Sequence, residues 1–186
     1  TRCDSEVIVH GFEEYGTALA GKLRGMFAFA IWDTKTNPLY GARDYFGIKP
    51  YYYTKTPSGL VFGSEIKSFL EHPDFKREVN PEALRPYLTF QYSAMEETFF
   101  KGTFKLPAAH WFTYKNGEMH IERYWDVDFT KKTTLSYDES AEEIDRRVRE
   151  SVAAHRISDV EVGAFLSGGA FSRQKPDISA NGNCRN

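Results

Sequence analysis

The chain has 186 residues, enough for one domain and part of a second. Hydrophobic residues make up 41% and charged residues 27%, which is typical of a soluble globular protein. The net charge of −2 argues against a nucleic-acid-binding or membrane-surface protein, and no apolar run approaches the roughly 20 residues that span a bilayer. Aromatic residues reach 16%, which favours β-rich structure because such side chains suit half-buried sheet surfaces.

The two cysteines, Cys3 and Cys184, lie near opposite ends of the chain and lack metal-ligand spacing. The histidines show no ligand spacing either, so no metal site is predicted. We expect free thiols in a reducing cytoplasm. The chain begins at Thr1 and enters a helical pattern almost at once, so we expect an internal fragment of a longer protein.

The first 64 residues are predicted to form two helical segments and then strands. Ile8, Phe12 and Tyr15 recur at spacings of four and three, which predicts one helix face. Asp4 or Ser5 is the expected cap. A shorter helical turn follows. Four strands are then predicted to form one antiparallel meander, at residues 26–33, 39–44, 50–54 and 60–64. The first of these strands is apolar enough to be buried on both faces.

Helices and a hairpin are predicted next. A short helix follows Ser64, which is placed to cap it. Asn80-Pro81 predicts a helix to about residue 90, because Asn is a preferred cap and Pro fits the first helical position. Asn116-Gly117 predicts a β-hairpin across residues 110–125.

A polar stretch marks the predicted domain boundary, near residue 130. Ser136 and Glu139 then form a capping-box pattern that predicts a long helix. Acidic residues precede basic residues by four positions on this helix, which favours helix formation. The expected pairs are Glu142–Arg146, Glu143–Arg147 and Asp145–Arg149, and the expected buried stripe is Ala141, Ile144, Val148 and Val152. A strand is predicted at residues 160–166.

Two glycine-containing motifs are candidates for function. Ser167-Gly168-Gly169 follows the last predicted strand, and its backbone N–H groups are able to face an anion because Gly adopts positive φ and lacks Cβ. Taken alone, this tripeptide is better interpreted as an ordinary turn. Arg43-Asp44 with Gly47 is, by itself, interpreted as a salt bridge and a sharp turn.

Seven segments occur in the order in which one family has them: DSEVIVHGFEEYG, LRGMFAFAIWD, ARDYFGIKPYYY, FGSEIKSFLEHP, REVNPEALRPYLTFQY, FKGTFKLPAAH and ERYWDV. Through them the chain resembles glutamine-hydrolysing asparagine synthetases of the bacterial type, from residue 1 to about 169. Arg43-Asp44, Gly47 and Ser64-Glu65 resemble the pattern shared by class II glutamine amidotransferases.

The resemblance implies an α+β fold in two domains. Residues 1–130 are expected to form an incomplete αββα sandwich of the N-terminal-nucleophile type, the class II amidotransferase domain with its connecting hairpin. Residues 131–186 are expected to begin an α/β adenine-nucleotide-binding domain. The tail departs from the family after about residue 170, where Phe171 and Arg173 replace Asp and Ser, so we expect a broken ATP loop.

The resemblance also implies a reaction. Glutamine is hydrolysed at one site, aspartate is activated by ATP as β-aspartyl-AMP at another, and ammonia passes between them to give asparagine, AMP, diphosphate and glutamate. ATP and Mg²⁺ are the implied cofactors of the parent enzyme. Its expected partners are glutamine, aspartate, ATP and a second copy of itself, in the cytoplasm, with no nucleic acid and no membrane.

The same resemblance assigns residue roles. Asp4 matches the carboxylate that holds the α-amino group of bound glutamine, a charge-assisted contact. The implied ATP-binding residues are Leu166, Ser167, Gly168 and Gly169. The catalytic cysteine is expected upstream of Thr1, and Cys3 is not that nucleophile. We therefore expect the chain alone to lack both activities and to bind the cofactors poorly.

Two other interpretations stay open. One is a two-domain glutamine amidotransferase with a different acceptor acid, because the acceptor pocket is expected beyond residue 186. The other is a non-catalytic β-rich module that binds a partner through exposed strand edges.

Overall fold

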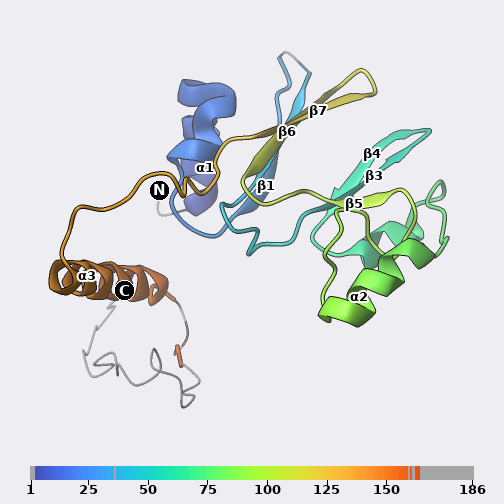
Figure 1. Ribbon diagram of the computed structural model, residues 1–186. Coiled ribbons are helices and arrows are strands. Elements are labelled where there is room, and N and C mark those ends of the chain that lie inside the picture. The colour runs from blue at the N-terminus through green and yellow to red at the C-terminus, as the bar shows by residue number, and fades with distance from the viewer. Residues whose placement is uncertain (1–2, 36, 159, 161, 164–186) are drawn as a thin grey trace. The chain divides into compact units, whose positions relative to one another are not determined.

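The computed structural model describes residues 3–35, 37–158, 160 and 162–163, in two compact units that divide between Asp128 and Phe129 (Figure 1). The first unit contains two antiparallel sheets. One sheet has the order β1-β2-β6-β7, with β1 Ala28–Trp32, β2 Leu39–Arg43, β6 His110–Lys115 and β7 Glu118–Arg123. The other has the order β4-β3-β5, with β3 Tyr52–Thr56, β4 Gly59–Gly63 and β5 Thr103–Lys105.

This pairing corrects the predicted single meander of residues 26–64. β2 pairs with β6 on its second edge, whereas β3 pairs with β5, so the four consecutive strands belong to two different sheets. The tight loop between Arg43 and Pro50 separates the two pairs of strands along the sequence. Strand propensity predicts the strands, but it carries no information on their long-range partners.

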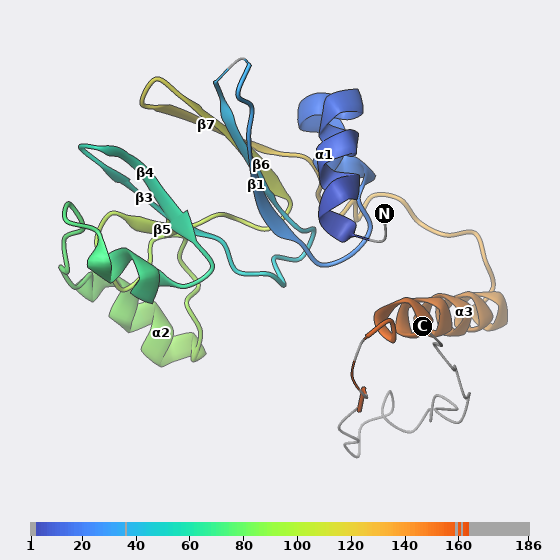
Figure 2. The same cartoon turned by 180° about the vertical axis from the view of Figure 1, so that it is seen from behind.

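Short helices cover the two sheets of the first unit. They are α1 Asp4–Tyr15, η1 Gly16–Lys22, η2 Ile66–Glu71, η3 Pro81–Ala83 and α2 Leu84–Phe90, the η elements being 3₁₀ helices. Figures 1 and 2 show α1 beside the first sheet and α2 beyond the second, so the layers run helix, sheet, sheet, helix. The ring of Phe12 on α1 lies 4.9 Å from that of Tyr40 on β2. The first unit is therefore a mixed α/β structure with antiparallel sheets, as predicted.

The core between the sheets is largely aromatic. Its buried members are Leu39, Tyr51, Tyr53, Leu106 and Phe112. Tyr51 and Phe112 meet edge to face, with ring centroids 5.6 Å apart, a geometry that aromatic quadrupoles favour. Gly41 makes room for Phe112, because a Cβ atom on Gly41 would lie 2.3 Å from Phe112 Cε1.

Local signals had mixed outcomes. Asn80 caps its helix as predicted, accepting the N–H of Glu82 at 3.1 Å, and Asn116-Gly117 forms the predicted hairpin with positive φ at both residues. Ser64 is not the predicted cap, because η2 begins one residue later, behind an extended Glu65 whose side chain makes no capping bond. β1 is half-buried rather than fully buried, because it lies at a sheet edge.

The second unit contains α3, Tyr137–His155, whose predicted capping box of Ser136 and Glu139 is confirmed. Two predicted ion pairs, Glu143–Arg147 and Asp145–Arg149, are present. Arg146 contacts Glu143 and Glu150 instead of Glu142, the partner predicted for it.

The predicted apolar stripe of α3 is not buried. Ile144, for example, is 56% exposed, and no residue of this helix is buried. The predicted strand at 160–166 falls mostly outside the described residues, and residues 160, 162 and 163 are not in a strand.

Candidate functional site

Arg43 lies at the end of β2 and is 7% exposed. Its guanidinium donates to three backbone carbonyls: Nε to Lys49 at 2.7 Å, Nη1 to Leu106 at 2.6 Å and Nη2 to Gly47 at 2.6 Å. Burial lowers the pKa of Arg43, and the negative charge of neighbouring Asp44 opposes that effect. Arg43 therefore holds two separate loops together through their carbonyl groups.

Asp44 is 1% exposed and binds backbone N–H groups. Its Oδ1 accepts from Phe46 at 3.2 Å and Ile48 at 3.0 Å, and its Oδ2 accepts from Lys49 at 2.9 Å and Phe27 at 3.3 Å. Both carboxylate oxygens are occupied, so Asp44 is not free to bind a ligand. The Arg43–Asp44 salt bridge considered from the sequence is replaced by two sets of side-chain-to-backbone bonds.

Gly47 completes this clamp, which consists of Arg43, Asp44 and the loop to Lys49. Its φ is +63°, in the left-handed region that favours glycine. A Cβ atom here would lie 2.9 Å from Arg43 Cζ and 3.2 Å from Ala108 Cβ. The sharp turn predicted at this position thus also allows the guanidinium to reach the Gly47 carbonyl.

Asp4 is the first residue of α1, and its carboxylate is exposed. Its Oδ1 accepts the N–H of Ser5 at 2.8 Å. The cap position belongs to Cys3 rather than to the predicted Asp4 or Ser5, and the Cys3 side chain makes no capping bond. Asp4 therefore presents a carboxylate that a ligand cation is able to reach.

The two views of the ribbon place the N-terminal end of α1 toward the end of the sheet where β1 begins and β2 ends (Figures 1 and 2). The N-terminal end of α1 and the end of β2, where the clamp begins, thus lie toward the same end of the first sheet. Asp44 connects the clamp to the start of β1 through two hydrogen bonds with Phe27. The Phe27 N–H donates to the Asp44 carboxylate, and the Asp44 N–H donates to the Phe27 carbonyl at 2.9 Å.

Ser64 and Glu65 line a different feature, an open pocket of about 440 Å³ at the second sheet. Pro50, Tyr52, Ile66 and Lys67 complete it, and Glu65 forms an ion pair with Lys67. A second open pocket, of about 540 Å³ at the β6–β7 hairpin, contains none of the predicted site residues. Neither Arg43 nor Asp44 lines this pocket, although Pro50 directly follows the clamp loop in the sequence.

The implied ATP-binding residues, Leu166, Ser167, Gly168 and Gly169, lie outside the described residues. Within the described part of the protein, no three acidic, histidine or cysteine side chains gather closely enough to hold a metal ion. No described helix is both long and apolar enough to cross a membrane.

The sequence reasoning missed Tyr124 as a partner of the clamp. Its Oη donates to the Arg43 carbonyl at 2.8 Å, and its ring meets that of Tyr45 edge to face. Burial, with the negative charge of Asp44 among the smaller causes, raises the pKa of Tyr124. The signal in the sequence was the repeated aromatic pair, Tyr45-Phe46 after Asp44 and Tyr124-Trp125 at the end of β7.

The first unit thus combines two antiparallel sheets, an exposed carboxylate at the start of α1 and a buried Arg43–Asp44 clamp. Residues 1–125 match the family model of the glutamine amidotransferase domain, and the protein belongs to this family.

Longer relatives extend the similarity beyond residue 125. Glutamine-hydrolyzing asparagine synthetase 3 of Bacillus subtilis is 39% identical over 178 residues, which cover 95% of this chain and 29% of that protein. Glutamine-hydrolyzing asparagine synthetase 1 of the same organism is 38% identical over 92% of this chain and 27% of its own length. The amidase chyE of Penicillium rubens is 34% identical over 91% of this chain and 25% of its own length. The 186 residues thus span between a quarter and a third of the length of these relatives.

Proposed function

We propose that these residues provide the glutamine-hydrolysing domain, and the start of the synthetase domain, of a glutamine-dependent asparagine synthetase. The observation that carries the proposal is the similarity to asparagine synthetases over 92–95% of the sequence, which continues past the amidotransferase domain. The proposed setting is the cytoplasm, with glutamine, aspartate and ATP as substrates.

Asp4 is proposed to bind the α-ammonium group of glutamine. Its carboxylate is exposed, and its two local hydrogen bonds, from the Ser5 N–H and the Cys3 thiol, both go to Oδ1, which leaves Oδ2 for a cation. A charge-assisted contact of this kind contributes about 1.5–3 kcal/mol to binding. Hydrolysis then breaks the amide C–N bond of the glutamine side group, adds water at the carbonyl carbon and releases ammonia and glutamate. We assign no nucleophile among the described residues.

The Arg43–Asp44 clamp is proposed to shape this site rather than to touch the substrate. Nε, Nη1 and Nη2 of Arg43 and both carboxylate oxygens of Asp44 already form hydrogen bonds with the backbone. Substitution of Arg43 or Asp44 is therefore expected to loosen the loop from Asp44 to Lys49 and the start of β1, with an indirect effect on glutamine binding.

The second half-reaction is proposed for the region that includes Leu166 and Ser167 to Gly169. There ATP would adenylate the β-carboxylate of aspartate, with release of diphosphate, and Mg²⁺ would offset charge on the phosphates. Ammonia would displace AMP to form asparagine. Ammonia that stays enclosed between the steps avoids protonation and loss to bulk water.

A second candidate is an amidotransferase of the same build that uses another acceptor acid. A fungal relative that is 34% identical is named an amidase rather than an asparagine synthetase. We keep the alternative for this reason. The acceptor alone separates the two candidates, since both consume glutamine.

The test uses the protein expressed from the complete reading frame that encodes these residues. It is incubated with glutamine, ATP and Mg²⁺, and with aspartate or a panel of other amino and carboxylic acids. Formation of asparagine, AMP and diphosphate supports the proposal. Glutamate formation that depends on another acid instead favours the second candidate, and failure to hydrolyse glutamine contradicts both.

A further inference from the structure

Helix α2 has one side that packs on the first unit and one side that is open. Ala83, directly before α2, is buried, and the ring of Tyr87 meets that of Phe99 edge to face with centroids 5.2 Å apart. Leu84 and Leu88 are both exposed, Leu88 to 70%. Because residues four apart lie on one side of a helix, these two leucines form an apolar stripe on the open side.

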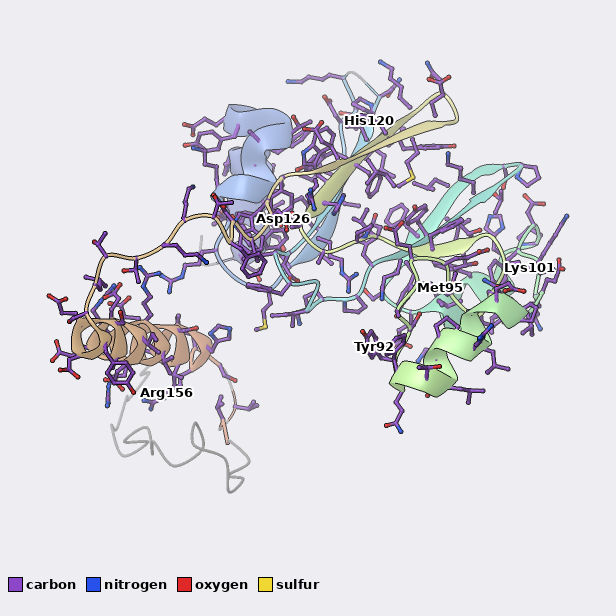
Figure 3. The ribbon with its side chains drawn as sticks, in the orientation of Figure 1. Tyr92, Met95, Lys101, His120, Asp126 and Arg156 are labelled. Carbon is purple, nitrogen blue, oxygen red and sulfur yellow. The ribbon has the colours of Figure 1, made fainter. Side chains whose placement is uncertain are left out.

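Two aromatic side chains add to this apolar surface at the C-terminal end of α2. Phe90 and Tyr92 are exposed, and their ring centroids lie 5.9 Å apart. Figure 3 labels Tyr92 just beyond the end of the helix. We call Leu84, Leu88, Phe90 and Tyr92 the α2 patch. All four side chains stay exposed among the described residues, and large apolar side chains that gather on a surface commonly mark an interaction site.

One acidic and one basic side chain border the α2 patch. η3 and α2 follow one another directly, so residues 81–90 form one helical segment. Glu82 and Arg85, three residues apart on this segment, are both exposed, and Arg85 lies three residues before Leu88. Neither charged side chain forms an ion pair with another described residue. Within the described part of the protein, the patch is thus bordered by one unpaired charge of each sign.

We propose that the α2 patch is a contact surface between two copies of this protein, whatever reaction the protein catalyses. A symmetric pair uses the same surface on both copies, so that surface must be complementary to itself. Two antiparallel copies of the helix, related by a twofold axis beside Leu84, place Glu82 of each copy opposite Arg85 of the other. The same arrangement brings Leu88 of each copy toward Val79 of the other, and both side chains are exposed. A patch bordered by charges of one sign would instead repel a second copy.

The first test measures the dissociation constant of the dimer by sedimentation equilibrium, with the protein from the complete reading frame. Leu88→Asp is expected to raise this constant about 10- to 100-fold, because it removes a leucine side chain that association buries. Val9→Asp is the control, since Val9 is 51% exposed on α1, and it is expected to keep the wild-type value. Equal association of Leu88→Asp and wild type overturns the proposal. A monomeric wild-type protein overturns it too, and assigns the patch to the rest of the polypeptide or to another protein.

Charge reversal tests whether the two copies meet as proposed. Glu82→Arg and Arg85→Glu each place like charges opposite one another, so each is expected to weaken its own dimer about 5- to 30-fold. An equimolar mixture of these two variants restores opposite charges at both contacts of a mixed dimer and is expected to associate as tightly as wild type. A mixture that associates as weakly as the single variants overturns the proposal. If Leu88→Asp does not fold, these two variants decide, because both side chains are exposed.

Discussion

Gly47 approaches Arg43 so closely that a Cβ atom on Gly47 would lie 2.9 Å from the guanidinium carbon. Gly47 thus has two roles. Its φ of +63° turns the backbone, and its lack of a side chain leaves space for the Arg43 guanidinium. The clamp depends on this contact, because the same guanidinium donates to the Gly47 carbonyl at 2.6 Å.

Gly47→Ala is therefore expected to lower the free energy of unfolding by about 2–4 kcal/mol, from the positive φ and from overpacking against Arg43. Gly117→Ala is the matched control, since its φ is +85° but no atom lies within 4 Å of the place that a Cβ would take. That substitution is expected to cost about 1–2 kcal/mol. Urea unfolding of the 186-residue protein measures both, and equal losses would show that the contact with Arg43 is unimportant.

Asp44→Asn is expected to destabilise the protein by about 2–4 kcal/mol. The substitution removes a charge and turns an NH₂ group toward N–H donors, so that buried donors lose their partner. Asp126→Asn, an exposed aspartate paired with Arg123, is expected to lose less than about 1 kcal/mol. Thermal unfolding monitored by circular dichroism compares the two, and similar losses contradict the role given to Asp44.

Removal of two different tyrosine hydroxyls is expected to have different effects on the free energy of unfolding. Tyr124→Phe removes the bond to the Arg43 carbonyl and is expected to cost about 0.5–1.5 kcal/mol. Tyr51→Phe removes a buried hydroxyl that has no partner among the described residues, so it is expected to be neutral or stabilising. Unfolding midpoints of the two variants in one denaturant series test this difference. A marked loss in Tyr51→Phe would reveal an unrecognised partner, such as an internal water.

The α3 ion pairs give a pH dependence of defined sign. Hydrogen bonds from Arg146 and Arg147 lower the pKa of Glu143 from 4.5 to about 2. Because the folded-state value is depressed, the stabilisation is present above about pH 4.5 and is lost as the pH falls toward 2. The carboxyl carbon of Glu143, followed by NMR, is expected to titrate near pH 2, and at higher pH in Arg146→Gln. An unchanged midpoint in that variant would show that the pair does not form in solution.

The sequence was most informative where structure is local. The capping box of Ser136 and Glu139 and the Asn116-Gly117 turn each act within four residues, so residue identity was sufficient to predict them. Pairing of β2 with β6 joins Gly41 to Phe112, and no pattern along either strand specifies that partner. The single-meander prediction failed for this reason.

The candidate site shows the same division. Adjacent Arg43 and Asp44 suggested a salt bridge, but Arg43 reaches Leu106, 63 residues away, and Asp44 reaches back to Phe27. Only the fold reveals those acceptors and donors. The assignment of Asp4 to glutamine rests on family resemblance rather than on spacing, and the structure adds that its carboxylate is exposed at the start of α1.

The most direct test of a glutamine site at Asp4 is the KM for glutamine of Asp4→Asn, in the protein from the complete reading frame. Loss of the charge-assisted contact is expected to raise KM about 10- to 100-fold with kcat little changed, since the contact is made in both ground and transition states. Glu14→Gln, at the other end of α1, is the control, and asparagine synthesis from added ammonia is expected to stay at the wild-type rate in both variants. A wild-type KM in an active Asp4→Asn protein would contradict the account.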